Sequence, residues 1–442
     1  MQLSPRKNPT SLRTGLALAA ASLLGPKAAS AAIEDVEVGS GVLVYTEPGR
    51  VSALEAVALV TRNFWDKHKL SLRVVYDTLT GASPNGAVAS RSPQTFTRPS
   101  GSGSYTVNAN ETPLDDTFKD TRFAGSLTYD RPFLSAGRWN VGLQGSSEHD
   151  YLSIGASTGI TREFDRKNTT ISLGVSGSRD EISPEGGVPT AFAEMGAATG
   201  HHEDDFTRGD DGEYDENRGE GSGDTKSVVD GVVGLTQVVN RTTLIRFNYS
   251  ISNSSGYLND PYKFVSVLYG PDDPSAGDPI TYLYEKRPDS HTKHSIYAQA
   301  KKRIASTTMD ISYRFLWDDW GITSHTAELK HRVPIGETVY FEPHVRLYEQ
   351  TAADFYRTYL LSGEALPAEA SADPRLGPMT AITVGNRVGG FHVGEQEFAV
   401  TLEYYRQFLK DGDQPAFGSL EGLDLSEDMG AFMFRISHGW EP

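Results

Sequence analysis

Segments of roughly ten to fourteen residues, in which apolar and polar side chains alternate strictly, recur along most of this chain. In residues 245–251, for example, Ile, Phe, Tyr and Ile alternate with Arg246, Asn248 and Ser250. Alternation with a period of two indicates a β-strand with one apolar face and one wetted face. Repetition over about 400 residues predicts an all-β fold, a transmembrane antiparallel up-and-down β-barrel.

The pattern predicts about sixteen strands. They lie near residues 36–46, 51–64, 68–79, 120–134, 138–148, 150–164, 168–179, 225–239, 242–253, 290–304, 307–317, 320–331, 337–349, 378–391, 396–408 and 427–440. The first two segments are the weakest, because Val51 to Phe64 is apolar on both faces and could include a short helix. A barrel of fourteen strands is therefore the open alternative.

Tight turns join many of the predicted strands, and long polar connections lie between several of these turns. The long connections lie near 80–118, 180–224, 254–289, 350–377 and 409–426. If the first strand begins in the periplasm, every long connection falls on the outer side and both chain ends fall inside, which favours an even strand number. We expect 80–118 and 256–289 to fold into the lumen and constrict it, held by pairs between loop acids and lumen arginines.

The first 31 residues resemble a secretory signal. Arg6, Lys7 and Arg13 precede the apolar run 16–24, and Ala29-Ser30-Ala31 fits a cleavage site. We therefore expect residues 1–31 to be removed and residues 32–442 to form a single barrel domain in the outer membrane of a Gram-negative bacterium.

Charge and composition exclude several classes of function. Removing residues 1–31 takes away four basic and no acidic side chains, so the formal charge changes from −17 to −21, which argues against nucleic-acid binding. The absence of cysteine excludes disulfides, thiolate metal sites, cysteine nucleophiles and a lipoprotein anchor. A mean hydropathy of −0.41, without an 18-residue apolar run in residues 32–442, excludes a bundle of membrane helices. A soluble β-sandwich or propeller is disfavoured by the length and the lack of a blade repeat.

Charged side chains on the second strand face need water, so we expect them to line the lumen. The lumen-lining candidates are Arg73, Asp77, Asp130, Arg246, Arg314, Glu342, Arg346 and Glu403. Their mixed charges favour small hydrophilic solutes over sugars.

One outer connection is unusually acidic, with ten carboxylates and two arginines in residues 201–224. Carboxylates at this density could bind Ca²⁺, although the spacing lacks an EF-hand register and such runs are commonly just solvated. The candidate ligands are Glu203, Asp204, Asp205, Asp210, Asp211, Asp215 and Glu216. No other cofactor is expected.

An enzyme is the least favoured class. Ser324, His325, His331, His344 and Glu342 lie on neighbouring predicted strands and could in principle form a hydrolase site. The G-x-S-x-G match at 155–159 lies inside an alternating strand, whereas the motif needs a strand-to-helix turn. No catalytic residue is therefore assigned.

Five segments carry a family resemblance: 77–87, 256–263, 284–290, 317–322 and 371–377. They closely resemble the bacterial family called domain of unknown function 3570, from about residue 33 to the C-terminus. The resemblance implies an outer-membrane barrel, often encoded near a flavin transferase and a small lipoprotein, and no established activity. Turn-forming and charged residues recur in these segments, at Gly81, Pro84, Asn85, Gly86, Asn259, Asp260, Pro261, Arg287 and Pro288. We expect them to order the outer loops.

These observations favour a gated or plugged porin-like channel, or a conduit or scaffold for a small lipoprotein or periplasmic redox partner. The alternatives are a structural or adhesin-like surface barrel with a cation-binding acidic loop, and a barrel-embedded hydrolase. Expected partners are outer-membrane lipid, lipopolysaccharide and the barrel-insertion machinery. The last is expected because the alternating C-terminal residues 432–440 resemble the strand that this machinery recognises. No nucleic-acid partner is expected.

Overall fold

The computed structural model describes residues 36–65, 67–81, 83–98, 103–114, 119–184, 186–195, 223–394, 396–410, 412, 414–425 and 428–439. Within these ranges the regular structure is β, apart from three single-turn 3₁₀ helices. They are η2 (Asp165–Lys167), η3 (Pro374–Leu376) and η4 (Gly418–Leu420). No helix in the described part of the chain is long and apolar enough to cross a membrane.

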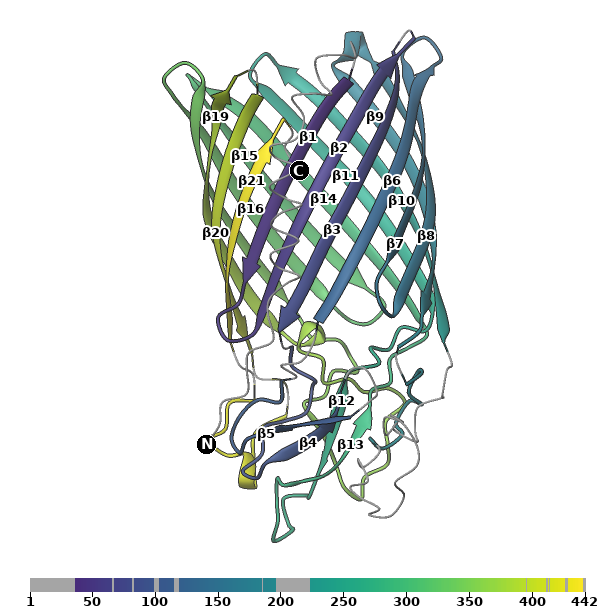
Figure 1. Ribbon diagram of the computed structural model, residues 1–442, viewed down its shortest axis with the longest axis vertical. Helices are drawn as coiled ribbons and strands as arrows, with labels where there is room; N and C mark the ends of the chain where they lie inside the picture. The colour runs from purple at the N-terminus through teal and green to yellow at the C-terminus, as the bar shows by residue number, and fades with distance from the viewer. Residues whose placement is uncertain are drawn as a thin grey trace, which may run out of the picture.

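Sixteen strands form one closed antiparallel barrel (Figure 1). In spatial order they are β1 (Val36–Thr46), β2 (Val51–Phe64), β3 (His68–Gly81), β6 (Lys119–Phe133), β7 (Gly137–Ser147), β8 (Tyr151–Phe164), β9 (Thr169–Ile182), β10 (Asp224–Asn240), β11 (Thr243–Gly256), β14 (Ser290–Ile304), β15 (Thr307–Asp318), β16 (Thr323–Ile335), β17 (Val339–Gln350), β19 (Met379–Val393), β20 (Gln396–Leu409) and β21 (Met429–His438). The predicted number is confirmed, and fourteen is wrong. β2 is a continuous strand with no helix, and β1 closes the barrel because Val44 pairs with both Leu54 and Phe434.

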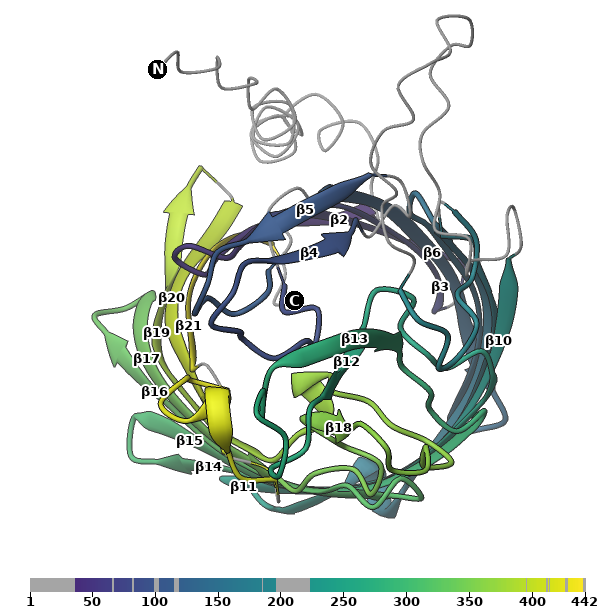
Figure 2. The ribbon, with the colours of Figure 1, turned by 90° about the horizontal axis from the view of Figure 1, so that it is seen from below.

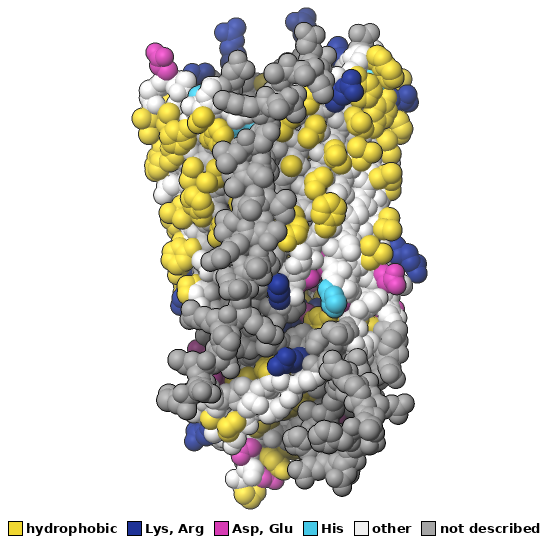
Figure 3. All heavy atoms as spheres, viewed as in Figure 1, with side chains coloured by type: hydrophobic (Ala, Val, Ile, Leu, Met, Phe, Trp, Pro, Cys, Tyr) yellow, Lys and Arg dark blue, Asp and Glu magenta, His cyan; other side chains and the backbone are white. Residues whose placement is uncertain are grey.

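The strand register separates an apolar face from a polar face. Leu72 pairs with Leu127, and Leu127 pairs with Leu143, and all three side chains are exposed. The neighbouring row contains Arg73, Ser126 and Gln144. Because adjacent strand residues point to opposite faces, the first row lies on the outer wall and the second lines the lumen. Figure 3 shows hydrophobic side chains spread over the outer wall.

The two ends of the barrel differ. Short turns join the strands at one end, where Gly336 and Gly394 have φ angles of 75° and 67°, as tight hairpins require. β1 begins and β21 ends at this turn end (Figure 1). The long connections all emerge at the opposite end, which we call the cap end.

The long connections fold together into a structure that we call the cap: the described residues of 83–114, 186–195, 257–289, 351–378 and 410–425. It contains a two-stranded sheet of β4 (Gln94–Thr97) and β5 (Ser104–Val107). A second sheet joins β13 (Pro279–Tyr284), β12 (Phe264–Leu268) and β18 (Tyr359–Leu361), with β18 parallel to β12. Figures 1 and 2 show these sheets beyond the strand ends, across the mouth of the barrel.

This position differs from the expectation that 80–118 and 256–289 fold into the lumen. The physical reason is that the cap has its own apolar core. Phe96 packs with Phe264 and Tyr284, and Leu268 packs with Tyr359 and other buried side chains. Burying such a side chain contributes about 1.5–3 kcal/mol. The loops therefore gain more free energy by packing their apolar side chains against one another than by packing them against the polar lumen wall.

Candidate functional site

Several of the family-like segments meet at one place in the cap. The Arg287 N–H donates to Asn259 Oδ1 at 2.7 Å, and the Phe264 N–H donates to the Asn85 carbonyl at 2.8 Å. Lys263 Nζ donates to the carbonyl oxygen of Pro84. Hydrogen bonds thus join the connection after β3 to the connection after β11.

Turn residues in these segments set the chain direction. Gly81 ends β3 with φ +124°, and a Cβ there would lie 2.1 Å from the Arg50 carbonyl. Gly86 has φ +93°, and its Cβ would lie 2.5 Å from the Phe264 carbonyl. Glycine is therefore required at both positions. Pro261 lies in a turn that is closed by the hydrogen bond from the Lys263 N–H to the Asp260 carbonyl. Pro288 directly precedes Asp289, whose carbonyl accepts a hydrogen bond from the Gly256 N–H.

A buried ion cluster lies at the centre of this junction. Arg287 Nε lies 2.6 Å from Glu285 Oε1, and Arg287 Nη2 lies 2.8 Å from Asp373 Oδ2. The Glu285 and Asp373 side chains are 1% and 2% exposed. Ser371 Oγ donates to Glu285 at 2.5 Å. The cluster therefore joins the loop that contains β13 to the loop that contains β18.

Arg375 extends the cluster to the surface. Its Nη2 contacts Asp373 and Asp260 at 2.5 Å each, and its side chain is 66% exposed. The sequence reasoning did not select Glu285, Asp373 or Arg375. One sequence feature could have indicated this cluster: an acidic residue two positions before an arginine, which occurs at Glu285-Lys-Arg287 and again at Asp373-Pro-Arg375.

Burial raises the pKa values of the three carboxyl groups of the cluster, and the neighbouring cations lower them. Burial raises the pKa of Glu285 to about 7, although Arg287 opposes the rise. Burial also disfavours ionised Asp373, but Arg375, Lys263 and Arg287 outweigh it and hold its pKa below the usual range. The same balance lowers the pKa of Asp260, where Lys263 and Arg375 are the main cations.

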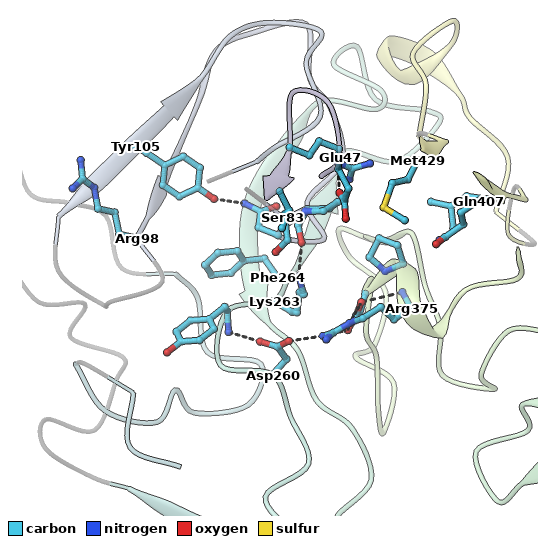
Figure 4. Close-up of a pocket in the computed structure, with 18 of the residues that line it drawn as sticks. Glu47, Ser83, Arg98, Tyr105, Asp260, Lys263, Phe264, Arg375, Gln407 and Met429 are labelled. Atoms are coloured by element: carbon cyan, nitrogen blue, oxygen red, sulfur yellow. Dashed lines mark hydrogen bonds and ion pairs between the residues drawn. The ribbon is translucent and has the colours of Figure 1, made fainter. Parts of the chain in front are cut away.

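A cavity of about 360 Å³ lies where the cap meets the barrel rim (Figure 4). One side is formed by the β1–β2 turn, with Glu47 and Arg50, and by the cap ends of β20 and β21. The other side is formed by cap residues of 83–85, 97–98, 260–264 and 373–375, together with Tyr105. This pocket is enclosed by barrel rim and cap together.

The pairing register places all eight lumen candidates on the polar inner face: Arg73, Asp77, Asp130, Arg246, Arg314, Glu342, Arg346 and Glu403. Several pair with inner-face neighbours across the strands. Asp77 lies 2.8 Å from Arg122 and Glu342 lies 2.6 Å from Arg332. Asp130 is bound by Arg138.

The expected pairs between loop acids and lumen arginines are not formed at Arg246 or Arg314 within the described residues. The acids of the cluster pair with cap arginines instead. Arg73, Arg246, Arg314 and Arg346 are exposed on the inner face, which requires a lumen that holds water.

The residues of the hydrolase alternative are spread over both faces of the wall. Ser324 faces the lumen, whereas His325 faces outward and contacts the Tyr313 hydroxyl at 2.6 Å. His331 also faces outward. His344 and Glu342 face inward, with His344 between Glu328 at 2.8 Å and Glu403 at 2.6 Å.

The motif at 155–159 lies within β8, where Ser157 pairs with Ser176 in an uninterrupted ladder.

The seven Ca²⁺ candidates all lie outside the described residues. They are Glu203, Asp204, Asp205, Asp210, Asp211, Asp215 and Glu216. In the part of the chain that the structure describes, no group of three or more His, Asp or Glu side chains is arranged to hold a metal ion.

Comparison with solved structures found several barrels. A mutant of the ferric enterobactin receptor PfeA of Pseudomonas aeruginosa is 9% identical with a TM-score of 0.43, and the match covers 89% of this chain and 56% of that chain. CdiB from Acinetobacter baumannii is 8% identical with a TM-score of 0.43, covering 92% and 60%. A bacterial polysaccharide outer membrane secretin is 8% identical with a TM-score of 0.41, covering 92% and 99%. The chain thus spans little more than half the length of the receptor.

No curated protein sequence matches the chain. The sequence profile of one family, described as "protein of unknown function (DUF3570)", matches residues 14–440.

Proposed function

This chain belongs to the DUF3570 family of proteins of unknown function, and we propose that it is an outer-membrane conduit for small hydrophilic solutes whose outer mouth is gated by the cap. The lumen supplies the pathway, and the cap supplies the closure. The observation that carries the proposal is a water-accessible, charge-lined barrel with an independently packed, ion-paired cap across one mouth.

The outer wall supports the location in a membrane. Large apolar side chains such as Leu143 and Val175 are exposed on it, and closure of the sheet satisfies the backbone hydrogen bonds, as a lipid environment demands. Such a wall would contact lipid and lipopolysaccharide. The cap end then faces outward, because outer-membrane barrels have short periplasmic turns and longer extracellular loops.

Conductance of the purified protein in planar bilayers tests the proposal. Lys286 and Ala370 exchange two backbone hydrogen bonds of 2.9 Å, a pairing with a Cα separation of about 5.5 Å that suits a disulfide. We expect the unmodified chain to open infrequently. The double variant Lys286→Cys, Ala370→Cys should stay closed when oxidised and recover its openings in dithiothreitol.

A second variant removes part of the gate by replacing residues 83–114 with a short Gly-Ser linker. We expect a constantly conducting pore, because this segment supplies Phe96 and Val88 to the cap core and no barrel strand. Heat-dependent migration in electrophoresis reports whether the barrel has folded. If the folded deletion variant does not conduct, the conduit is excluded and a scaffold remains. A wide, permanently open pore in the unmodified chain would exclude the gate.

A further inference from the structure

We propose that the pocket between the barrel rim and the cap binds a small organic anion, an anionic group carried on a flat apolar body. The inference goes beyond gating, because binding requires only the closed cap. It rests on the charges, the unpartnered polar atoms and the apolar wall of the 360 Å³ cavity.

The acids that line this cavity are already engaged by other groups. Glu47 accepts a hydrogen bond from the Tyr45 hydroxyl at 2.6 Å. Asp373 accepts hydrogen bonds from Arg287 and Arg375, and Asp260 accepts from Arg375 and from the Tyr262 N–H. A bound cation would have to compete with these internal partners, so the acids do not favour one.

Two of the cations that line the cavity, Arg50 and Lys263, retain unused donors. Arg50 is the clearest case: its side chain is 12% exposed, and the Nε atom lies 3.9 Å from Glu47 Oε2. This Nε has no hydrogen-bond partner among the described residues. Lys263, which is 6% exposed, donates to the Pro84 carbonyl and has two further ammonium protons.

A second buried polar atom points to the same ligand. Thr97 lines the cavity and is 7% exposed, and its hydroxyl has no hydrogen-bond partner within the described residues. An unsatisfied buried polar group costs about 1–3 kcal/mol. Arg50 Nε and the Thr97 hydroxyl are both covered by neighbouring atoms. After a small rotation of these side chains, an anionic group would accept hydrogen bonds from the guanidinium, the ammonium and this hydroxyl, and would recover that cost.

Apolar side chains form another part of the lining. Tyr105 and Pro374 contribute from the cap, and Leu409 and Met429 contribute from the rim; Tyr105 and Met429 lie on opposite sides in Figure 4. Ligand pockets commonly measure about 300–1,000 Å³, so this one suits a molecule near the small end of that range. A single ring that carries a carboxylate or a phosphate has the required shape.

Isothermal titration of the full chain in detergent tests the proposal with benzoate, phenyl phosphate, inorganic phosphate and benzylamine. We expect saturable binding of benzoate or phenyl phosphate, and none of benzylamine. The two aromatic anions distinguish a carboxylate ligand from a phosphate ligand. Arg50→Gln should weaken the binding at least tenfold and Thr97→Val severalfold. Met429→Ala should weaken the binding of the aromatic anions more than the binding of inorganic phosphate.

The matched control is Arg241→Gln, which removes the same charge at the turn end, where Arg241 is exposed. It should leave the affinities unchanged. Absence of saturable binding for both aromatic anions overturns the proposal. The proposal is also overturned if Arg50→Gln and the unmodified chain are both folded and bind the anions with equal affinity. Because binding is measured without a bilayer, this failure is separable from a failure of the conduit.

Discussion

Replacing Arg287 with methionine is expected to open the cap about a hundredfold to a thousandfold more often, while the barrel stays folded. Arg287 is 10% exposed and lies between Glu285 and Asp373, so its loss leaves two buried carboxylates without their shared cation. Removing one partner of a buried ion pair typically costs about 3–5 kcal/mol, and each 1.4 kcal/mol is about tenfold. The barrel strands pair with one another and do not depend on this contact.

The absence of cysteine makes cap opening measurable. Ala370, which is fully buried beside the cluster, is replaced with cysteine as a buried reporter. Ser275→Cys, at an exposed position of the cap, provides the reference. The ratio of their thiol-labelling rates gives the fraction of time for which the cap is open.

The matched control for Arg287 is Arg375→Met. It removes the same type of side chain from the same partner, Asp373, but Arg375 is 66% exposed, so water can take the place of part of its guanidinium, and Asp373 keeps its ion pair with Arg287. We expect a smaller change than in Arg287→Met. Equal effects of the two substitutions would show that burial of the Arg287 cluster does not hold the cap together.

Raising the pH from 5 to 8 is expected to loosen the cap about a hundredfold, through Glu285. The pKa of Glu285 is raised from 4.5 to about 7, mainly by burial. The closed cap therefore holds a proton that the open cap releases. Its contribution to stability is complete below pH 4.5 and is lost as the pH rises through about 7. Each pKa unit corresponds to about tenfold in the opening equilibrium.

The other carboxyls of the cluster act in the opposite direction and at lower pH. The pKa values of Asp260 and Asp373 are lowered in the closed cap, so their contribution is complete above about pH 4 and is lost only as the pH falls through the lowered values. Between pH 5 and 8 both remain ionised. Glu285 is therefore the carboxyl of this cluster that titrates in the window.

The same labelling ratio, measured from pH 5 to 8, checks this prediction, because the reference cysteine corrects for thiol ionisation. Glu285→Gln should flatten the profile. Glu148→Gln is the control: burial also raises the pKa of Glu148 to about 7, but Glu148 follows β7 at the barrel rim, outside the cluster. A profile that flattens in Glu148→Gln and not in Glu285→Gln would assign the pH dependence to the rim.

The barrel could be predicted from the sequence because its pattern is local. In β11, Ile245, Phe247 and Tyr249 alternate with Arg246 and Asn248, and the structure places the two sets on opposite faces. Even β2, which looked ambiguous, forms a strand because its backbone groups pair with β1 and β3 on both sides. A pattern repeated sixteen times, with every long connection at the same end, leaves few alternative folds.

The cap could not be predicted because its contacts join distant segments. Its strands are short, and β12 is buried along Val265 and Ser266 on both faces, so no alternation identifies it. Arg287 and Asp373 meet although they lie 86 residues apart. The distinctive segments showed that the loops would be ordered, but not that they would pack on one another across the mouth.

The sequence by itself determined the barrel, the faces of the strands and the end from which the long loops emerge, because alternation and turn length act between near neighbours; it left sixteen and fourteen strands open, and the structure has sixteen. Only the tertiary structure decided that the loops form a cap with its own core, that Glu285, Arg287 and Asp373 meet in it, and that Arg50 and Thr97 share a pocket. Those features depend on which loops gain the most free energy by burying apolar surface and pairing charges with one another, and the whole fold decides which loops can meet.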